Sequence, residues 1–204
     1  MNNRGTDVRN GRPDRRVART RRALGDALMR LLQDHDLESV TVQQVLDTAG
    51  VGRATFYGHF RGKQDLLLSH FESVMEWMEA HLEREPPGSR RVAPVAEMCA
   101  HLAHAQGQIG AIAASGQLDA IWGLGQSHLN AMIARRLARL FPGSDTALTS
   151  RFCAGALAEL LKWWMWRADR PTPEEMDALY HERVWNGCLG PAASALPQRH
   201  QPAQ

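Results

Sequence analysis

The sequence predicts an all-α protein with about nine helices, divided into a small N-terminal helix-turn-helix domain and a larger C-terminal helical domain. Apolar residues recur at helical spacing along most of the chain, and the strict alternation typical of β-strands is absent. Stretches that contain Pro and Gly at 84–89 and 141–144 interrupt this pattern and indicate loops. A chain of 204 residues can bury a separate core in each of two such domains.

Each helix is expected where the apolar periodicity begins and ends at capping or breaking residues. Pro94 and the run Thr172-Pro-Glu-Glu175 mark the starts of two later helices. The expected helices are 14–34, two within 41–60, 63–82, 94–105, a short one punctuated by Gly107, Gly110 and Gly116, then 117–140, 145–168 and 172–188. The expected domains are a disordered basic arm 1–13, a helix-turn-helix domain 14–62, a helical domain 63–190 and a disordered tail 191–204.

The stretch 41–60 has the pattern of a helix, a tight turn and a second short helix. Thr41 and Gln44 can form a capping box at the start of the first helix, and Gly50 suits the left-handed position that ends it. The following segment carries polar side chains and is too short to build a core of its own. This layout is typical of a helix-turn-helix, whose second helix enters the DNA major groove. An αα-hairpin with a polar exposed face is the alternative interpretation.

The same stretch resembles the N-terminal domain of tetracycline-repressor (TetR) family transcription regulators. The matching pieces are Thr41 to Ala49, Ala49-Gly50-Val51, Thr55-Phe56-Tyr57, His59-Phe60, and Lys63 followed by Leu66-Leu67. Together with the preceding helix, the resemblance covers roughly residues 15–75. Gly52 departs from the family pattern, in which a serine often caps the second helix, because glycine is a weaker cap.

The resemblance implies a role for each matching residue on a double-stranded DNA operator. Phosphates would be bound by Arg15, Arg19 and Thr41, base edges would be read by Gln43, Arg53, Ala54 and Thr55, and the DNA backbone would be held by Tyr57, His59 and Lys63. The excess of Arg over acidic residues between positions 4 and 22 supports phosphate contact. A solvated tail without contacts is the alternative for this basic stretch.

The helix expected over 145–168 carries two apolar stripes, whereas packing on one side requires only one. One stripe comprises Cys153, Leu157, Leu160, Leu161 and Trp164, and the other comprises Leu148, Phe152, Trp163 and Trp166. The resemblance implies that the last two helices pair with their copies in a four-helix bundle, which makes a homodimer. The predicted dimer-interface residues are Leu148, Phe152, Ala156, Trp163, Met176 and Tyr180. A central helix buried within one subunit is the alternative.

The middle of the chain is where an effector site is expected, because Met and Trp side chains suit adaptable apolar pockets. The candidate lining residues are Phe71, Met75, Met78, Cys99, Leu102, Trp122 and Trp164. The same residues could equally form plain core. His101 and His104 have a spacing that could hold a metal, but no third ligand is suitably spaced, so neither a metal nor a cofactor is predicted.

Composition and motifs favour a cytoplasmic regulator over an enzyme. The three cysteines are odd in number and far apart, which argues against a disulfide framework, and neither a signal peptide nor a membrane-spanning run is present. Gly123-Leu-Gly125 lacks the context of a dinucleotide site. The expected function is that of a repressor that binds a palindromic operator as a homodimer and is released by a small apolar or aromatic effector. The alternative is a helical small-molecule-binding protein or enzyme with an incidental helix-turn-helix.

Overall fold

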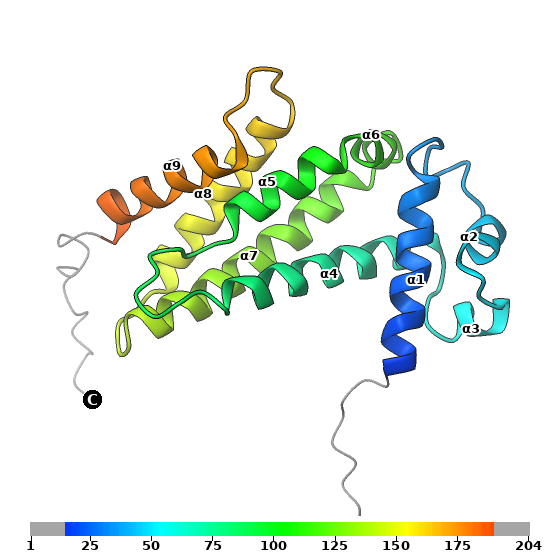
Figure 1. Cartoon of the computed structure of the whole chain (residues 1–204), viewed down its shortest axis with the longest axis horizontal. Coiled ribbons are helices and arrows are strands. Elements are labelled where there is room, and N and C mark those ends of the chain that lie inside the picture. The colour runs from blue at the N-terminus through cyan, green and yellow to red at the C-terminus, as the bar shows by residue number, and fades with distance from the viewer. Residues whose placement is uncertain (1–14, 190–204) are drawn as a thin grey trace, which may run out of the picture. The chain divides into compact units, whose positions relative to one another are not determined.

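A computed structural model describes residues 15–189, and every regular element within this range is helical (Figure 1). The predicted all-α fold class is confirmed. The described chain divides into two compact units, residues 15–70 (unit 1) and 71–189 (unit 2), and the boundary falls inside helix α4 (Lys63–Leu82). The predicted arm 1–13 and tail 191–204 lie outside the described residues. None of the helices in the described part of the chain is long and apolar enough to cross a membrane.

Unit 1 contains α1 (Arg15–Leu31), α2 (Val42–Ala49), α3 (Arg53–Tyr57) and the first two turns of α4. Helix α2 packs against α1, and α3 follows α2 after a short turn (Figure 1). The buried apolar residues of this unit are Leu24, Ala27, Leu28, Leu32, Leu37, Val40, Val45, Leu46, Phe56, Phe60, Leu66 and Leu67. The helix-turn-helix is therefore held by a small apolar core, as its apolar spacing predicts.

The capping signals around α2 are confirmed. The Thr41 hydroxyl accepts a hydrogen bond from the Gln44 N–H at 3.2 Å, and Gln44 Oε1 accepts one from the Thr41 N–H at 2.7 Å. Gly50 ends the helix at φ 65°, where a side chain would be strained, and its N–H donates to the Leu46 carbonyl. Gly52 precedes α3 and offers no side-chain cap, so this end of the helix-turn-helix is the more weakly fixed one.

Gly25 allows α1 to approach the start of α4 closely within unit 1. A Cβ atom at position 25 would lie 2.5 Å from His70 Nδ1. Burial lowers the pKa of His70 and outweighs the opposing effect of Asp26, so the neutral imidazole is favoured at this contact. The contact holds His70 against α1 within unit 1.

Unit 2 is a helical bundle built from the rest of α4 and the helices that follow it. Helix α7 lies beside α8, and α5 lies beside α9 (Figure 1). Their bounds are α5 Val95–His104, α6 Gln106–Ala114, α7 Leu118–Leu140, α8 Ala147–Met165, α9 Pro173–Arg183 and a π-helical turn Val184–Cys188. The polar atoms of two buried aromatic residues have partners, because Trp164 Nε1 donates to the Pro171 carbonyl and the Tyr180 hydroxyl donates to the Cys153 carbonyl.

The helix ends differ from the expected ones by up to three residues. Helix α1 ends at Leu31 and α8 ends at Met165, and each of these ends lies three residues before the expected one, because turns follow the two helices. The capping box of α9 is confirmed, with Thr172 and Glu175 bonded in both directions.

One arginine side chain holds three carboxylates together in unit 2. Arg91, in the loop between α4 and α5, pairs with Glu85 at 2.8 Å, Glu97 at 2.5 Å and Asp177 at 2.7 Å. Asp177 lies on α9 and also accepts a hydrogen bond from the Ala96 N–H. The network therefore joins the loop, the first turn of α5 and the middle of α9.

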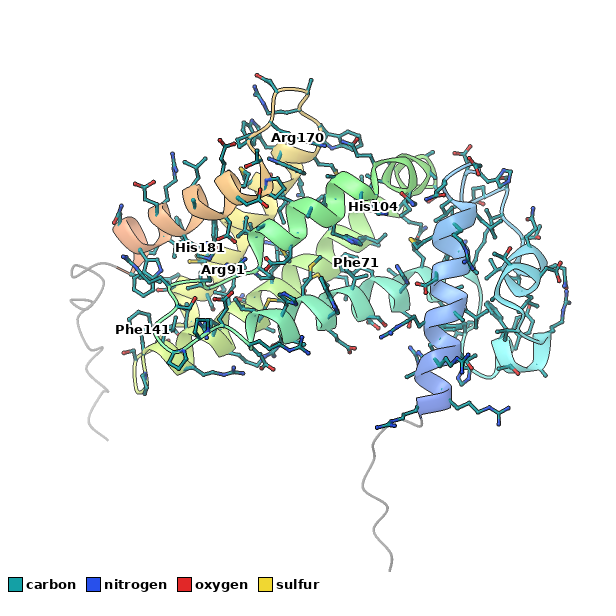
Figure 2. The ribbon with its side chains drawn as sticks, in the orientation of Figure 1. Phe71, Arg91, His104, Phe141, Arg170 and His181 are labelled. Carbon is teal, nitrogen blue, oxygen red and sulfur yellow. The ribbon has the colours of Figure 1, made fainter. Side chains whose placement is uncertain are left out.

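His181 extends this network and lies close to Arg91 in Figure 2. Its Nε2 accepts hydrogen bonds from the N–H groups of Val92 and Ala93 at 3.0 and 3.4 Å. Its Nδ1 lies 2.7 Å from the Asp177 backbone carbonyl oxygen and 3.2 Å from Asp177 Oδ2, so the ring contacts both the loop and α9. Burial opposes ionisation of the Asp177 carboxyl, but hydrogen bonds from His181 and Arg91 outweigh it and lower the pKa to about 2.

Replacing Arg91 with Met should lower the free energy of unfolding by roughly 3 kcal/mol, because three partly buried carboxylates lose their cation. Calorimetric unfolding measures this loss. The matched control is Arg139→Met, whose pair with Glu83 is about half exposed, and we expect a much smaller change there. Equal losses in both variants would show that the Arg91 network contributes no more than a surface pair.

The depressed pKa of Asp177 also predicts how stability depends on pH. The folded pKa of about 2 lies below the unfolded value of about 3.9, so the stabilisation is present above about pH 4 and is lost as the pH falls toward 2. An Asp177→Asn variant should show a smaller fall in melting temperature than the wild type between those pH values. Parallel pH profiles for the two proteins would contradict this assignment.

Candidate functional site

The helix-turn-helix of unit 1 carries an exposed polar surface on α2 and α3. The predicted DNA-binding residues that are exposed are Arg15, Arg19, Thr41, Gln43, Arg53, Ala54, Thr55 and Tyr57, and those that are half-buried are His59 and Lys63. The structure thus brings α2 and α3 residues from the predicted set onto accessible positions of one small unit. A short helix that displays side chains of this kind can bind phosphates and base edges.

Phe56 anchors α3 to the rest of unit 1. Its side chain is fully buried, and its ring lies 5.2 Å from the Tyr57 ring and 5.7 Å from the Phe60 ring. A helix of five residues is not stable by itself, so this burial is what holds α3 in place. Tyr57 keeps 54% of its surface exposed, which leaves its hydroxyl accessible for a phosphate contact.

A chain of hydrogen bonds links the start of α3 to α2. The Arg53 guanidinium donates from Nη2 to Gln43 Oε1 at 2.9 Å, and Gln43 Nε2 donates to Asp47 Oδ1 at 2.8 Å. Arg53 and Gln43 belong to the predicted base-reading set, but Asp47 does not. The i,i+4 spacing of Gln43 and Asp47 on one helix is the signal that could have identified this acidic residue.

Two residues of the basic and capping region already have internal partners. The Thr41 hydroxyl donates to Gln44 Oε1 at 2.9 Å, so a phosphate contact from this hydroxyl would have to replace that bond. Arg21, from the basic stretch of α1, donates to the Ser69 hydroxyl and lies over the Phe60 ring at 5.2 Å from its centroid. This arginine therefore stabilises the packing of α1 on α4, whereas Arg15 and Arg19 remain exposed.

The structure gives Lys63 a different role from the expected phosphate contact. Its ammonium group donates to the carbonyls of Leu37, Glu38 and Val40 at 2.7, 2.9 and 3.0 Å. An ammonium group has three protons, so these three acceptors use its whole donor capacity. Lys63 therefore fixes the loop that precedes α2 and has no proton left for a phosphate in this arrangement.

The predicted effector-binding residues gather in one hydrophobic cluster of unit 2. Met75, Met78, Cys99 and Trp164 are buried in it, and Phe71, Leu102 and Trp122 pack against its edge as half-buried side chains. The Phe71 ring, labelled in Figure 2, fits against α7 at Gly125, where an added Cβ would come within 3.2 Å of it. The clustering is compatible both with an apolar pocket and with plain core.

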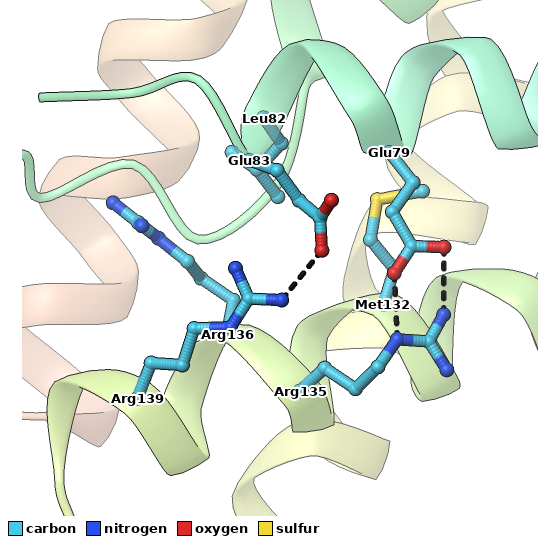
Figure 3. Close-up of a pocket in the computed structure, with 7 residues that line it drawn as sticks. All are labelled: Glu79, Leu82, Glu83, Met132, Arg135, Arg136 and Arg139. Carbon is cyan, nitrogen blue, oxygen red and sulfur yellow. Dashed lines mark hydrogen bonds and ion pairs between the residues drawn. The ribbon is translucent and has the colours of Figure 1, made fainter.

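A surface pocket of unit 2 lies between α4 and α7 and has a different character (Figure 3). Its lining residues are Glu79, Leu82, Glu83, Met132, Arg135, Arg136 and Arg139, so it includes none of the predicted effector-binding residues. Arg135 binds Glu79 with two hydrogen bonds at 2.6 and 2.7 Å, and Arg139 binds Glu83. Because these two pairs join α4 to α7, the pocket is a small hollow lined by ion pairs between the two helices.

Two of the three cysteines in the described residues are buried in unit 2. Burial raises the pKa values of Cys99 and Cys153 to about 12, so both thiols stay protonated and unreactive at neutral pH. Within residues 15–189, no group of three or more His, Cys, Asp or Glu side chains is placed to hold a metal ion.

The two predicted stripes of α8 occupy different environments. Cys153, Leu157, Leu161 and Trp164 are buried, and Leu160 is half-buried. The second stripe is exposed along the helix: Leu148 keeps 71%, Phe152 62%, Trp163 47% and Trp166 64% of its surface. Large apolar side chains exposed together on one helix face indicate an interaction surface.

Two residues of the predicted dimer interface do not belong to that exposed surface. Met176 and Tyr180 on α9 are 3% and 2% exposed, because they pack into the core of their own unit, and the Tyr180 hydroxyl bonds to the Cys153 carbonyl. Ala156 is half-buried next to the exposed stripe. On α9, the large apolar side chain that remains exposed is Leu179, at 38%.

Replacing Lys63 with Met should loosen unit 1, because three carbonyls would lose their donor at a cost of roughly 1–3 kcal/mol. Hydrogen–deuterium exchange should show lost protection in peptides from unit 1 and unchanged protection in peptides from unit 2. Arg61→Met, which removes an exposed cation two residues away, is the control and should leave both units unchanged. Unchanged exchange in Lys63→Met would return this lysine to the set of candidate phosphate contacts.

Comparison with known sequences agrees with the geometry of unit 1. Residues 24–69 match the family model described as bacterial regulatory proteins, tetR family. The chain is 40% identical over 55 residues to an uncharacterized HTH-type transcriptional regulator, YxbF, of Bacillus subtilis (strain 168). This match spans 26% of the chain and 14% of the length of the relative.

Solved structures extend the likeness to most of the chain. A TetR transcriptional regulator from Streptococcus agalactiae 2603V is 25% identical, with 84% of this chain and 96% of that chain covered at a TM-score of 0.52. A structure from Listeria innocua shares the fold at a TM-score of 0.60, with 16% identity and coverage of 86% of this chain and 94% of that chain. The helix-turn-helix geometry and the family-model match identify residues 24–69 as a tetR-family regulatory domain, and the solved structures show that the chain as a whole shares the fold of tetR-family regulators.

Proposed function

We propose that this protein is a ligand-responsive repressor that binds a palindromic operator as a homodimer and is released by a small apolar or aromatic effector. The observation that carries the proposal is the construction of α3. Its buried Phe56 fixes the helix, while Arg53, Ala54 and Thr55 remain exposed, where they can reach base edges. A side-chain arrangement of this kind has no evident use in an incidental helical hairpin.

In this proposal the exposed residues divide into base readers and phosphate binders. Arg53, Ala54 and Thr55 read base edges, Gln43 supports Arg53 through a hydrogen bond, and Arg15, Arg19, Thr41, Tyr57 and His59 contact the DNA backbone. The division follows from chemistry, because cationic and hydroxyl side chains on α1 and at the helix ends suit phosphate oxygens. Lys63 supports the site from within unit 1 through its three carbonyl acceptors.

The homodimer is proposed to form through the exposed stripe of α8. A second copy is the natural occupant, because a palindromic site requires two recognition helices about 34–36 Å apart. Leu148, Phe152 and Trp163 would bury their exposed surface against the same residues of the copy. The half-buried Ala156 lies among them and would allow the two helices to approach.

The effector is proposed to bind among the apolar residues of unit 2. Met75, Met78 and Trp122 belong to or border the hydrophobic cluster, and flexible Met side chains can rearrange around a small apolar molecule. Helix α4 contributes to both units, so a ligand that changes its conformation would change DNA affinity, typically by about 5–150-fold. Release of bound DNA by a screened set of apolar and aromatic compounds tests this part of the proposal.

Selection from a random double-stranded DNA library should enrich a palindromic sequence, and binding titrations on that duplex then test individual contacts. Arg19→Ala should weaken binding to all duplexes alike and reduce the slope of log affinity against log salt by about 0.9, because one phosphate contact is lost. Arg30→Ala removes an exposed cation near the other end of α1 and is the control. Failure of the wild-type chain to enrich any sequence would overturn the proposed function.

Trp163→Glu should convert the protein to a monomer, because an unpaired charge in an apolar interface is costly to bury. Sedimentation velocity at micromolar concentration measures the change. Trp77→Glu is a matched control, since Trp77 on α4 is similarly exposed, at 55% against 47% for Trp163, and lies outside the proposed interface. A dimeric Trp163→Glu variant, or a monomeric wild type, would remove the α8 stripe from the assembly.

A further inference from the structure

We propose that Gln43 and Asp47 are positioning residues that aim the Arg53 guanidinium at a guanine in the operator. The inference rests on the proposed function, because it concerns how the same surface would distinguish one base pair from another. It adds Asp47, a residue outside the expected DNA-binding set, and it names the base.

The geometry of the hydrogen-bond chain fixes the orientation of each group. Gln43 Oε1 accepts from Arg53 Nη2 at 2.9 Å, and Gln43 Nε2 donates to Asp47 Oδ1 at 2.8 Å. A carboxylate can accept hydrogen bonds but cannot donate them, so Asp47 must face the nitrogen of the Gln43 amide. This contact sets the orientation of the amide. The amide oxygen is thereby directed at the guanidinium of Arg53.

The neutral amide between the two charges leaves the guanidinium available. A direct pair between Arg53 and a carboxylate would commonly be bidentate and would occupy the donor fork. Here one Nη2 donor is engaged by a neutral oxygen, and an arginine has five N–H donors in total. Two parallel donors therefore remain for guanine O6 and N7, which is the pair of acceptors that a bidentate arginine reads.

The position of Arg53 makes this support valuable. All three residues are exposed, and an unrestrained arginine side chain loses about 2 kcal/mol of rotamer freedom when it is immobilised. Arg53 is also the first residue of α3, where the helix dipole presents partial positive charge and disfavours a cation. Because its hydrogen bond to Gln43 on α2 already restrains the Arg53 side chain, less rotamer entropy is lost when Arg53 binds DNA.

The negative charge of Asp47 gives the chain a measurable signature. A carboxylate on a DNA-facing surface repels phosphates, so it weakens binding to every sequence. If Asp47 also positions Arg53, its removal raises affinity for unrelated DNA and lowers discrimination at one base pair. A residue whose only role is the i,i+4 bond within α2 would not produce the second effect.

The test uses the full-length protein and the duplex selected from a random library. Arg53→Ala first identifies the base pair that this residue reads, as the position where discrimination falls by about tenfold. Asp47→Ala and Gln43→Ala should each reduce discrimination at that same position by roughly threefold, and should do so no further in an Arg53→Ala background. Asp34→Ala is the control. It removes an exposed carboxylate that does not belong to the hydrogen-bond chain, and it should leave the base preference unchanged. Unchanged melting temperatures establish that α2 remains folded in these variants.

Three outcomes would overturn the inference while leaving the proposed function intact. Discrimination could be unchanged in Arg53→Ala, unchanged in Asp47→Ala, or altered by Asp47→Ala at a different base pair, in which case Asp47 reads a base itself. Enrichment of no sequence by the wild-type chain would instead overturn the proposed function, and the inference with it. Both the inference and the proposed function are supported if Asp47→Ala and Arg53→Ala reduce discrimination at the same base pair and the double variant shows no further loss.

Discussion

The recognition surface depends on the burial of a single aromatic side chain. Helix α3 has five residues, no side-chain cap and a cation at its first position, so its own sequence does not stabilise it. Phe56 supplies what is missing by placing its whole ring in the core of unit 1, beside Phe60. The neighbouring side chains of Arg53, Ala54 and Thr55 remain exposed, because the packing of α3 rests on Phe56.

In each unit, one cation binds several oxygen acceptors and so joins different segments of that unit. Lys63 satisfies three carbonyls of the loop before α2, and Arg91 neutralises three carboxylates from separate parts of unit 2. The three carbonyls lie more than 20 residues before Lys63, and Asp177 lies 86 residues after Arg91, whereas Glu85 and Glu97 each lie six residues from it. Partly buried acceptors without donors are costly, so these two side chains determine the shape of their loops.

The sequence predicts features whose cause is local and fails where the cause is a distant contact. The capping boxes of Thr41 and Thr172 and the left-handed Gly50 were predictable, because each depends on residues within one turn. The role of Lys63 was not, since its acceptors lie more than 20 residues earlier in the chain. Met176 and Tyr180 show the same limit: their apolar character identifies a buried face but not whether the burying partner is the same subunit or another.

The residues that contradict local rules are concentrated on two surfaces. On α3, Arg53 stands at the unfavourable end of a helix dipole, and on α8 a stripe of large apolar side chains faces solvent. In the rest of the described chain, the capping boxes of α2 and α9 and the ion pairs of Arg91 agree with the structure around them. Natural sequences are consistent across these levels except where function requires otherwise. The two exceptions coincide with the surfaces that the proposed function requires, one for DNA and one for a second copy of the chain.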